Sequence, residues 1–248
     1  MHVGIAGNIG AGKTTLTRLL AKSFGWEPHY EETDTNPYLI SFYEDMERWS
    51  FNLQVYFLNT RFRQIMDIRE KKKTVIQDRT IYEDAYIFAS NLHDMNLMST
   101  RDFNNYISLF ELMTSFIQAP DLLIYLKADV STLVRNIQKR GRKYEESIRL
   151  DYLNSLNKKY EDWISTYKSG KLLIIDVNTI DFENNPADLA FIIEKINIDT
   201  YIVAYATIGE HTVANTPLIA ALYVLSAFTI VPPTKPPAAT APKTKNIP

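Results

Sequence analysis

The stretch from residue 7 to residue 14, GNIGAGKT, constrains the fold of this chain more than any other feature. It fits the spacing G-x-x-x-x-G-K-[ST], in which a glycine-rich loop ends on a lysine and a hydroxyl residue. An apolar run at residues 3–6 precedes it, and an amphipathic pattern at residues 15–21 follows it. This order of strand, loop and helix is the context that a phosphate-binding loop requires, and an ordinary tight turn would explain neither Lys13 nor Thr14.

The residues of this loop indicate how a nucleotide would be held. Glycines let the backbone curl so that several N–H groups point inward, and the N-terminus of the following helix adds positive charge. Lys13 can reach the β- and γ-phosphates, and the Thr14 hydroxyl can ligate Mg²⁺. The predicted nucleotide-binding residues of the loop are Gly7, Asn8, Ile9, Gly10, Ala11, Gly12, Lys13, Thr14 and Thr15.

Apolar runs that alternate with helical patterns predict a parallel sheet wrapped by helices. The expected strands lie at residues 3–6, 28–31, 74–78, 122–127 and 172–176. The expected helices lie near residues 14–24, 47–71, 82–92, 101–117, 131–139, 149–167 and 186–196. Together with the phosphate loop, this order predicts a P-loop NTPase-type α/β fold, with a parallel five-stranded sheet flanked by helices, in a domain of residues 1–198.

Composition restricts the class of ligand. The 248 residues carry a net charge of −2, so the chain lacks the basic surface that a nucleic-acid polymer requires. The absence of cysteine excludes disulfides and thiolate metal sites and suits a reducing compartment. No signal peptide precedes the first strand, so we expect a cytoplasmic protein that binds a small phosphorylated ligand.

Residues 199–248 are expected to form a C-terminal extension of different composition. Residues 218–231 are a 14-residue apolar run, broken only by Ser226 and Thr229, which is short for a transmembrane helix of about 20 residues. Residues 232–248 are rich in Pro, Ala, Thr and Lys, which is typical of disorder. A helix packed on the domain or a partner, a weakly membrane-associating segment and a sequence unrelated to the activity all stay open.

The second predicted strand ends at an acidic residue, Glu31. Ligands of parallel α/β sheets bind at the carboxyl ends of the strands, so this carboxylate is expected beside the phosphate loop. There it could accept the proton of a hydroxyl that attacks a γ-phosphate. The alternative is a solvated acidic turn, because Glu32 and Asp34 follow closely.

The third predicted strand ends in Asp78 and Arg79. Acidic residues at this place bind Mg²⁺ directly or through water in phosphate-loop enzymes. The guanidinium of Arg79 can bind oxyanions in a bidentate fashion, and so can hold the catalytic carboxylate and the transferred phosphate together. The alternative is a purely structural Asp–Arg pair.

A short arginine-rich lid is expected around Gly141. Its cations are Arg135, Lys139, Arg140 and Arg142. Closure of this segment would bring guanidinium groups onto the phosphates as negative charge moves to the leaving group. The alternative is a solvated basic helix end, which the helix dipole favours.

Six ordered motifs resemble the deoxyribonucleoside kinase family, and the bacterial purine-preferring branch in particular. They are GNIGAGKT, Glu31 with NPY at 36–38, FYEDMERWSFNLQ at 42–54, DRTIYED at 78–84, KRGRKYEE at 139–146 and DVNTIDF at 176–182. The resemblance spans residues 1 to about 198. It implies transfer of the ATP γ-phosphate, with Mg²⁺, to the 5′-hydroxyl of a deoxyribonucleoside in nucleotide salvage.

The resemblance also implies a role for individual residues. Glu31 would be the general base, with Glu32 as the alternative, and Arg79 would orient it. Tyr43 and Glu145 would bind the 3′-hydroxyl, and Gln54 would bind the base edge. The remaining roles fall on Arg61 and Asp84 for base recognition, on Arg140 and Arg142 as lid arginines, on Asn178, Asp181 and Phe182 for the donor adenine, and on Trp49, Phe51, Phe88 and Phe116 as candidate walls around the base.

The pair of Arg61 and Asp84 bears on which nucleoside is preferred. A purine or cytosine presents ring nitrogens and an amino group that such a pair can satisfy, whereas thymine presents a methyl group and an N3–H. An unpaired buried polar group costs about 1–3 kcal/mol, so deoxyadenosine or deoxyguanosine is expected before deoxycytidine, and thymidine last.

Two other functions remain open at this point. A nucleoside monophosphate kinase of the thymidylate type shares the phosphate loop and the Asp–Arg pair, but it needs no carboxylate base. A non-catalytic nucleotide-binding module would bind ATP without turnover, against which stands the full set of Lys13, Glu31, Asp78 and Arg79. The long helices expected at residues 47–71 and 82–92 would leave an apolar patch, so a homodimer is expected.

Overall fold

The structure is a computed structural model, and it describes residues 1–31, 33, 35–145 and 147–208, with side chains to residue 198. Met1–Ala204 forms one compact unit. The predictions for the extension after residue 208, which include the apolar run and the tail, lie outside the described residues.

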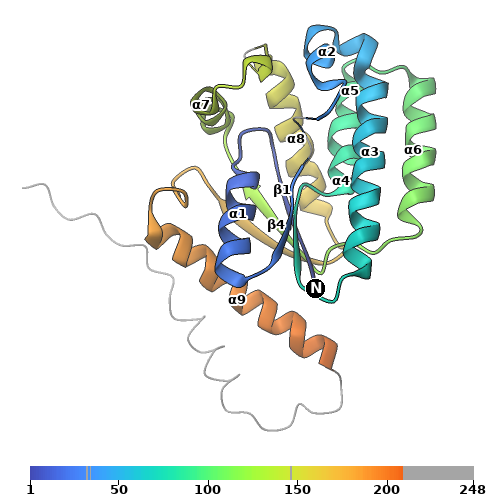
Figure 1. Ribbon diagram of the computed structural model, residues 1–248. Helices are drawn as coiled ribbons and strands as arrows, with labels where there is room; N and C mark the ends of the chain where they lie inside the picture. Colours follow the sequence, from blue (N-terminus) through green and yellow to red (C-terminus); the bar gives the residue numbers. More distant parts are fainter. Residues whose placement is uncertain (32, 34, 146, 209–248) are drawn as a thin grey trace, which may run out of the picture. The chain divides into compact units, whose positions relative to one another are not determined.

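The centre of the unit is a five-stranded parallel sheet, as predicted (Figure 1). Its strands are β1 (His2–Gly7), β2 (Glu27–His29), β3 (Val75–Asp78), β4 (Leu122–Lys127) and β5 (Lys171–Asp176). Their spatial order is β2-β3-β1-β4-β5. In register, Val3 of β1 lies opposite Ile76 of β3 on one side and Leu122 of β4 on the other.

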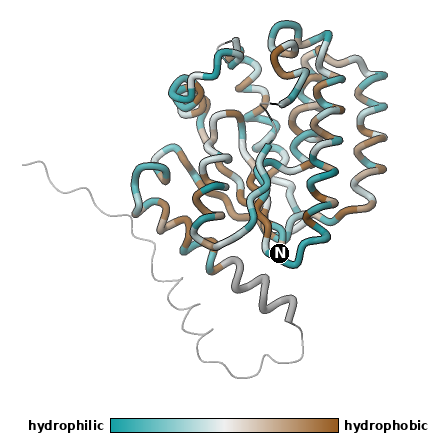
Figure 2. The backbone as a smooth tube through the Cα atoms, in the orientation of Figure 1, coloured by the Kyte–Doolittle hydropathy of each residue, from teal (hydrophilic) through white to brown (hydrophobic). Residues whose placement is uncertain are grey.

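Both faces of the sheet are covered, and successive residues of β4 serve the two faces in turn. Leu122, Ile124 and Leu126 belong to one buried apolar cluster, and Leu123 and Tyr125 belong to the other. Side chains alternate across a strand, so near-continuous apolar runs are expected when helices pack on both faces. Brown, apolar stretches accordingly recur in the sheet and at intervals along the helices (Figure 2).

Helices on the two faces differ in number and length (Figure 1). The cluster that contains Leu122, Ile124 and Leu126 also includes residues of α1 (Lys13–Phe24) and α9 (Pro186–Ile208). The cluster that contains Leu123 and Tyr125 also includes residues of α3 (Met46–Glu70), α6 (Thr100–Thr114) and α8 (Leu150–Thr166). Further helices are α2 (Leu39–Glu44), α4 (Ile81–Glu83), α5 (Ser90–Asp94) and α7 (Val130–Arg140), with a 3₁₀ turn η2 at Lys143–Glu145. In the described part of the chain, no helix has both the length and the apolar character needed to cross a bilayer.

The long helix predicted at residues 47–71 is confirmed as α3, and its start has a local cause. The side chain of Asp45 accepts a hydrogen bond of 3.0 Å from the Arg48 amide, which caps the first turn. The buried side chains of α3 include Leu53, Phe57 and Leu58, which recur at helical spacing. This helix places Gln54 and Arg61 one behind the other along its inner side.

Several segments differ from the sequence-based expectation. The strand β2 ends at His29 and not at Glu31, α6 ends at Thr114 and not at residue 117, and α9 continues past residue 196 to Ile208. The single helix expected at residues 82–92 is wrong: α4 is followed by a π-helical segment, η1 (Asp84–Ala89), and then by α5. The π-helical turn is wider than an α-helical one, and such turns occur often at functional sites. The short helix α2 was not expected, because its six residues are too few to show a helical period.

Candidate active site

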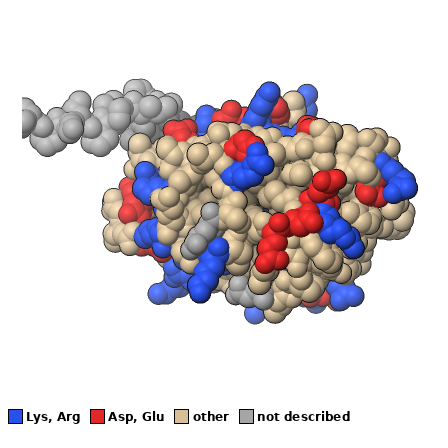
Figure 3. Space-filling view, turned by 90° about the horizontal axis from the view of Figure 1, so that it is seen from above, with Lys and Arg blue, Asp and Glu red and all other residues tan. Residues whose placement is uncertain are grey.

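A cavity of ≈ 880 Å³ lies at the carboxyl ends of the strands. The predicted residues that line it are Ile9, Gly10, Ala11, Gly12, Lys13, Thr14, Thr15, Glu31, Tyr43, Gln54, Arg79, Phe88, Arg135, Lys139, Arg140, Arg142, Glu145, Asn178, Asp181 and Phe182. The predicted residues that are buried without lining it are Gly7, Asn8, Arg61, Asp78 and Asp84. Charges of both signs are interspersed on the face seen from above (Figure 3).

The phosphate loop connects β1 to α1 and is held in a curled form. Gly10 and Gly12 have φ values of 87° and 93°, a region in which side chains other than glycine are strained. The Ala11 amide donates to the Asn8 carbonyl at 3.1 Å, and Lys13 Nζ donates to the same carbonyl at 3.2 Å. Burial, and then the charge of Arg79, lowers the pKa of Lys13 to about 8, so the amine is still mainly protonated at pH 7.

Thr14 and Asp78 supply oxygen atoms that suit Mg²⁺. The Thr14 hydroxyl donates to Asp78 Oδ2 at 2.5 Å, and the buried Asp78 Oδ1 has no hydrogen-bond partner among the described residues. No group of three or more metal-ligating His, Cys, Asp or Glu residues occurs in the described ranges. Mg²⁺ in kinases is typically held by one or two protein oxygens and by substrate phosphates, so this donor set fits the ion.

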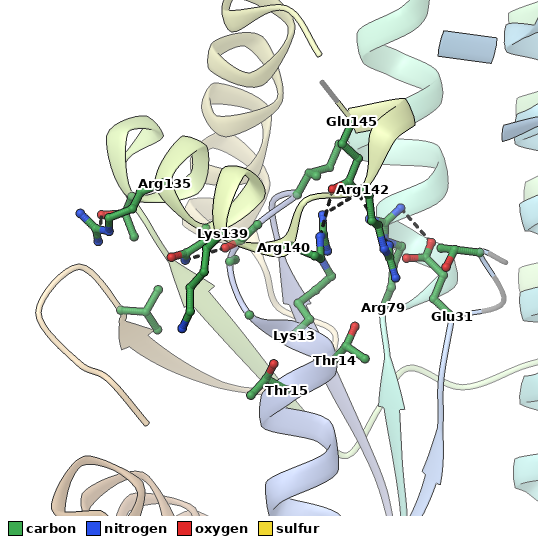
Figure 4. Close-up of a pocket in the computed structure, with 18 of the residues that line it drawn as sticks. Lys13, Thr14, Thr15, Glu31, Arg79, Arg135, Lys139, Arg140, Arg142 and Glu145 are labelled. Atoms are coloured by element: carbon green, nitrogen blue, oxygen red, sulfur yellow. Dashed lines mark hydrogen bonds and ion pairs between the residues drawn. The ribbon is translucent and has the colours of Figure 1, made fainter. Parts of the chain in front are cut away.

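Glu31 follows β2 and meets Arg79, which follows β3. Arg79 Nη1 lies 3.1 Å from Glu31 Oε1, and the two side chains face each other across the cavity wall (Figure 4). Arg79 has φ 70°, an uncommon value for a residue with a side chain, and its guanidinium stacks 4.2 Å from the Phe88 ring centroid. A strained backbone at such a residue is held by its surroundings and is often functional.

A second guanidinium contacts the same carboxylate oxygen. Arg61 Nη2 donates to Glu31 Oε1 at 2.6 Å. Arg61 Nε in turn lies 2.6 Å from Asp84 Oδ2. The base-recognition residues of the sequence prediction are therefore close to each other, but they lie behind the wall of the cavity and one of them is paired with Glu31.

The ionisation of Glu31 and Asp84 reflects this arrangement. Burial raises the pKa of Glu31, but the charges of Arg79, Arg61 and Lys13 outweigh burial and bring that pKa down to about 2. At Asp84, burial is stronger than the opposing charges of Arg61 and Arg79 and raises the pKa to about 6. Glu31 is thus ionised at neutral pH.

The arginine segment, residues 139–145, lines the cavity beside Tyr43 of α2. Arg140 donates to Glu145 through Nε at 3.0 Å and through Nη2 at 2.6 Å, and Arg142 Nη1 lies 3.6 Å from the same carboxylate (Figure 4). Tyr144 stacks on Tyr43 of α2, with ring centroids 5.8 Å apart. The two residues predicted to bind a sugar hydroxyl, Tyr43 and Glu145, therefore lie on adjacent parts of the wall.

Gln54, Phe57 and Phe88, from α3 and η1, also line the cavity. Gln54 Oε1 is buried and has no hydrogen-bond partner among the described residues. An unpaired buried amide oxygen is costly unless a ligand satisfies it. Of the other aromatic residues considered as walls, Trp49 and Phe51 do not line the cavity, and the side chain of Phe116 is 60% exposed, so that interpretation of Phe116 is wrong.

Residues of α7 and of the loop after β5 line another part of the cavity. The ring of Phe182 packs against Gly12 so closely that a Cβ there would lie 2.8 Å from Cζ. Asn136 of α7 donates to the Gly10 carbonyl at 2.8 Å, which ties α7 to the phosphate loop. Lys139 pairs with Glu183 at 3.2 Å, and Arg135 donates to Thr132 at 3.3 Å.

Glu83 is a residue of the site that the sequence reasoning missed. Its side chain is fully buried, and one oxygen accepts from the Gly7 amide at 3.3 Å and from the Tyr160 hydroxyl at 2.9 Å. The other accepts from the Thr80 amide at 2.7 Å and the Thr80 hydroxyl at 3.1 Å. The spacing Thr-x-x-Glu is a capping-box signal that could have marked this residue.

Fold and cavity together define a phosphate-loop nucleotide-binding protein with an acid–arginine pair at its strand ends. A family model described as deoxynucleoside kinase matches residues 3–202. The chain belongs to the deoxynucleoside kinase family. This membership confirms the predicted family and its kinase activity, and decides against the monophosphate-kinase and non-catalytic alternatives.

Relatives from several organisms carry related names. A deoxyadenosine/deoxycytidine kinase of Bacillus subtilis is 41% identical over 78% of this chain and 90% of its own length. A deoxyadenosine kinase of Dictyostelium discoideum is 37% identical over 78% of each chain, and a deoxyguanosine kinase of Lactobacillus acidophilus is 36% identical over 77% of this chain and 87% of its own. Among solved structures, a deoxyadenosine kinase of M. mycoides with bound dATP has a TM-score of 0.71 and 30% identity, over 79% of this chain and 99% of its own.

Proposed function

We propose that this deoxynucleoside kinase transfers the γ-phosphoryl group of ATP to the 5′-hydroxyl of a purine deoxynucleoside. The observation that carries the proposal is the position of Glu31 and Lys13 on one cavity wall, a proton acceptor and a phosphate-binding cation that face the same space. ATP is proposed as donor because the phosphate loop is complete and because a related kinase has been solved with dATP.

In the proposed reaction, Glu31 accepts the proton of the 5′-hydroxyl as its oxygen bonds to the γ-phosphorus, and the bond from that phosphorus to the β-phosphate oxygen breaks. Arg79 holds Glu31 from the side and presents its guanidinium to the transferred group. Lys13 and the phosphate-loop amides hold the phosphates. Arg140 and Arg142, which are paired with Glu145 in this structure, would turn to the phosphates as the arginine segment closes.

Thr14 and Asp78 would hold Mg²⁺. When bound, the ion would neutralise phosphate charge and orient the phosphates. The support is chemical: a hydroxyl and a carboxylate lie together at the phosphate loop, and Asp78 Oδ1 has no partner in the described part of the chain.

For the nucleoside, we propose that Tyr43 and Glu145 bind the 3′-hydroxyl and that Gln54 binds the base edge, with Arg61 and Asp84 completing base recognition from behind the wall. Asn178, Asp181 and Phe182 would flank the donor adenine. Support for a purine comes from Gln54 Oε1, which lines the cavity, has no hydrogen-bond partner among the described residues and can accept from an amino group, and from the names of the relatives.

The variant Glu31→Gln tests the function. It keeps the volume of the side chain but cannot accept the proton, so kcat should fall about a hundredfold or more, with little change in ATP binding. The matched control is Glu32→Gln on the neighbouring glutamate, which should keep most of the wild-type rate. Rates are compared with deoxyadenosine, deoxyguanosine, deoxycytidine, thymidine and deoxyadenosine monophosphate. A loss confined to Glu32→Gln would move the base to residue 32, and turnover of the monophosphate alone would overturn the proposal.

We also propose that the chain forms a homodimer and works in the cytoplasm. Support for the dimer is the exposed aromatic surface beside η1, where Tyr86 is 47% exposed and stacks on Tyr82. Light scattering should give twice the chain mass in solution, and a monomer mass at micromolar concentration would contradict the dimer.

A further inference from the structure

Four charged side chains form a continuous row from the interior of the domain to the wall of the cavity. It runs from Asp84 of η1 through Arg61 of α3 to Glu31 and Arg79 at the strand ends. One oxygen, Glu31 Oε1, receives both guanidinium groups, from Arg61 at 2.6 Å and from Arg79 at 3.1 Å. The general base is therefore held from two sides.

The other end of Arg61 forms an ion pair with Asp84. Its Nε lies 2.6 Å from Asp84 Oδ2, and each of these side chains is 1% exposed. The guanidinium also lies over the Phe57 ring, 5.3 Å from its centroid. Neither Arg61 nor Asp84 lines the cavity. Arg61 thus reaches the reaction site through Glu31 rather than through open space.

We infer that Arg61, anchored by Asp84, is a positioning residue of the general base Glu31, and that this contact connects the base-recognition end of the cavity with the phosphoryl-transfer end. This inference rests on the proposed function, in which Glu31 accepts the 5′-hydroxyl proton. It gives Arg61 a role in the rate of transfer to every acceptor, in addition to any role in choosing among bases.

The physical reason is geometric and electrostatic. A carboxylate held by two guanidinium groups has little rotational freedom, and a misplacement of about 1 Å can cost about a hundredfold in rate. The charges that act on Glu31 come from several elements: Arg79 and Asp78 at the end of β3, Arg61 on α3, Lys13 on α1 and Asp84 on η1. Loss of Arg61 removes a cation from this set, which raises the pKa of Glu31 and leaves two buried carboxylates with one cation fewer.

The test is the variant Arg61→Met, which keeps an unbranched apolar side chain and removes the guanidinium. Its kcat with deoxyadenosine should fall about tenfold or more, a part of what general-base catalysis contributes. Because Glu31 would then be protonated at higher pH, activity should fall with acidification at a higher pH in the variant than in the wild type. The donor phosphates titrate alike in both assays, so the difference between the pH profiles of variant and wild type does not come from them.

A second acceptor separates positioning from base reading. Purine 2′-deoxyriboside carries neither an amino nor an oxo group on its ring. A positioning role predicts that Arg61→Met lowers kcat by a similar factor for this acceptor and for deoxyadenosine. A role in base recognition alone predicts a smaller loss with purine 2′-deoxyriboside, which keeps the ring nitrogens but lacks the amino group, together with an unshifted acid limb, and that result would overturn the inference. If the wild type does not phosphorylate purine 2′-deoxyriboside, the acid limb of the pH–activity profile with deoxyadenosine is sufficient to distinguish the two roles.

Two further variants guard against a folding defect. Arg61→Lys keeps the charge but cannot bridge both carboxylates, so it should fold and show a smaller loss of kcat. Asp84→Asn removes the anchor, and with purine 2′-deoxyriboside, which has no amino group to recognise, its combination with Arg61→Met should be no slower than Arg61→Met alone. Additive losses, or a wild-type rate in Arg61→Lys, contradict the inference. A wild-type protein that phosphorylates no deoxynucleoside contradicts the proposed function instead.

Discussion

At the scale of single residues, Glu83 is the buried carboxylate that joins three parts of the site. It accepts from Gly7 at the entrance to the phosphate loop, from Thr80 directly after the strained Arg79, and from Tyr160 of α8. Two of its donors are backbone amides, so each of its oxygens must act as an acceptor. Glu83 therefore holds the backbone at the entrance to the phosphate loop and directly after Arg79.

The variant Glu83→Gln replaces one accepting oxygen by an amide nitrogen, so either the Gly7 or the Thr80 amide loses its partner. A buried donor left unpaired costs about 1–3 kcal/mol, and the free energy of unfolding in urea should fall by that amount. The KM for ATP should rise because the entrance to the phosphate loop is loosened. Glu161→Gln, on the exposed side of α8 next to Tyr160, is the matched control and should change neither quantity.

The positions of Glu31, Asp78 and Arg79 could be predicted because each follows an apolar strand directly. The choice of partner by Arg61 could not. Glu31 and Asp84 are separated from Arg61 by 30 and 23 positions, and only the packing of α3 against η1 and the segment after β2 decides which carboxylate it meets. Glu83 has the same difficulty, since its contact with Gly7 spans 76 positions.

At the scale of elements, the phosphate loop and α7 are in close contact. A Cβ on Gly10 would lie 2.7 Å from the Leu133 carbonyl oxygen and 3.0 Å from Ile137 Cγ1. The nearer atom belongs to the helix backbone and cannot turn aside. Gly10 thus allows α7, which leads into the arginine segment, to approach the loop that binds the phosphates.

The variant Gly10→Ala should therefore push α7 away from the phosphate loop, weaken ATP binding at least about tenfold and lower the thermal midpoint. The matched control is Gly25→Ala after α1. Gly25 has φ 67°, yet a Cβ there would meet no described atom within 4 Å. It should cost only the strain of a left-handed residue, about 1–2 kcal/mol, and keep wild-type kcat and KM. Equal loss of ATP binding in both variants would show that backbone strain, and not the contact with α7, is responsible.

Elements with a strong period of apolar residues could be predicted from the sequence. Elements that depend on tertiary contacts could not. The helix α3 has a long apolar period and a capping aspartate, Asp45, so its bounds came within one residue at each end. The π-helical segment after Glu83 has no sequence period of its own, since it forms where the buried Asp84 meets Arg61 of α3. The helix α2 is too short to carry a pattern.

At the scale of the whole molecule, the parallel sheet divides the described core into two apolar clusters that do different work. The cluster with α3, η1 and α8 lies behind Gln54, Phe57 and Phe88 of the cavity, and the cluster with α1 and α9 includes Ala11 of the phosphate loop. Strand alternation along the chain predicted the class of fold. It did not predict the order β2-β3-β1-β4-β5, because that order depends on which way each crossover turns.

The residues of the cavity and of the two clusters predict where the chain can be shortened. All residues that line the cavity come before residue 184, the family match ends at residue 202, and the compact unit ends at Ala204. A chain that stops after Ala204 should keep the wild-type kcat, KM and thermal midpoint. A chain that stops after Asn185 loses α9, whose Ile192 and Ile196 are fully buried, and each isoleucine contributes about 1.5–3 kcal/mol by its burial. The second truncation should therefore melt at a lower temperature or fail to fold, although it retains every residue of the cavity. If the first truncation loses phosphorylation of deoxyadenosine while its circular dichroism spectrum stays native, the segment after residue 204 takes part in the reaction, and the domain of this kinase must be drawn further along the chain.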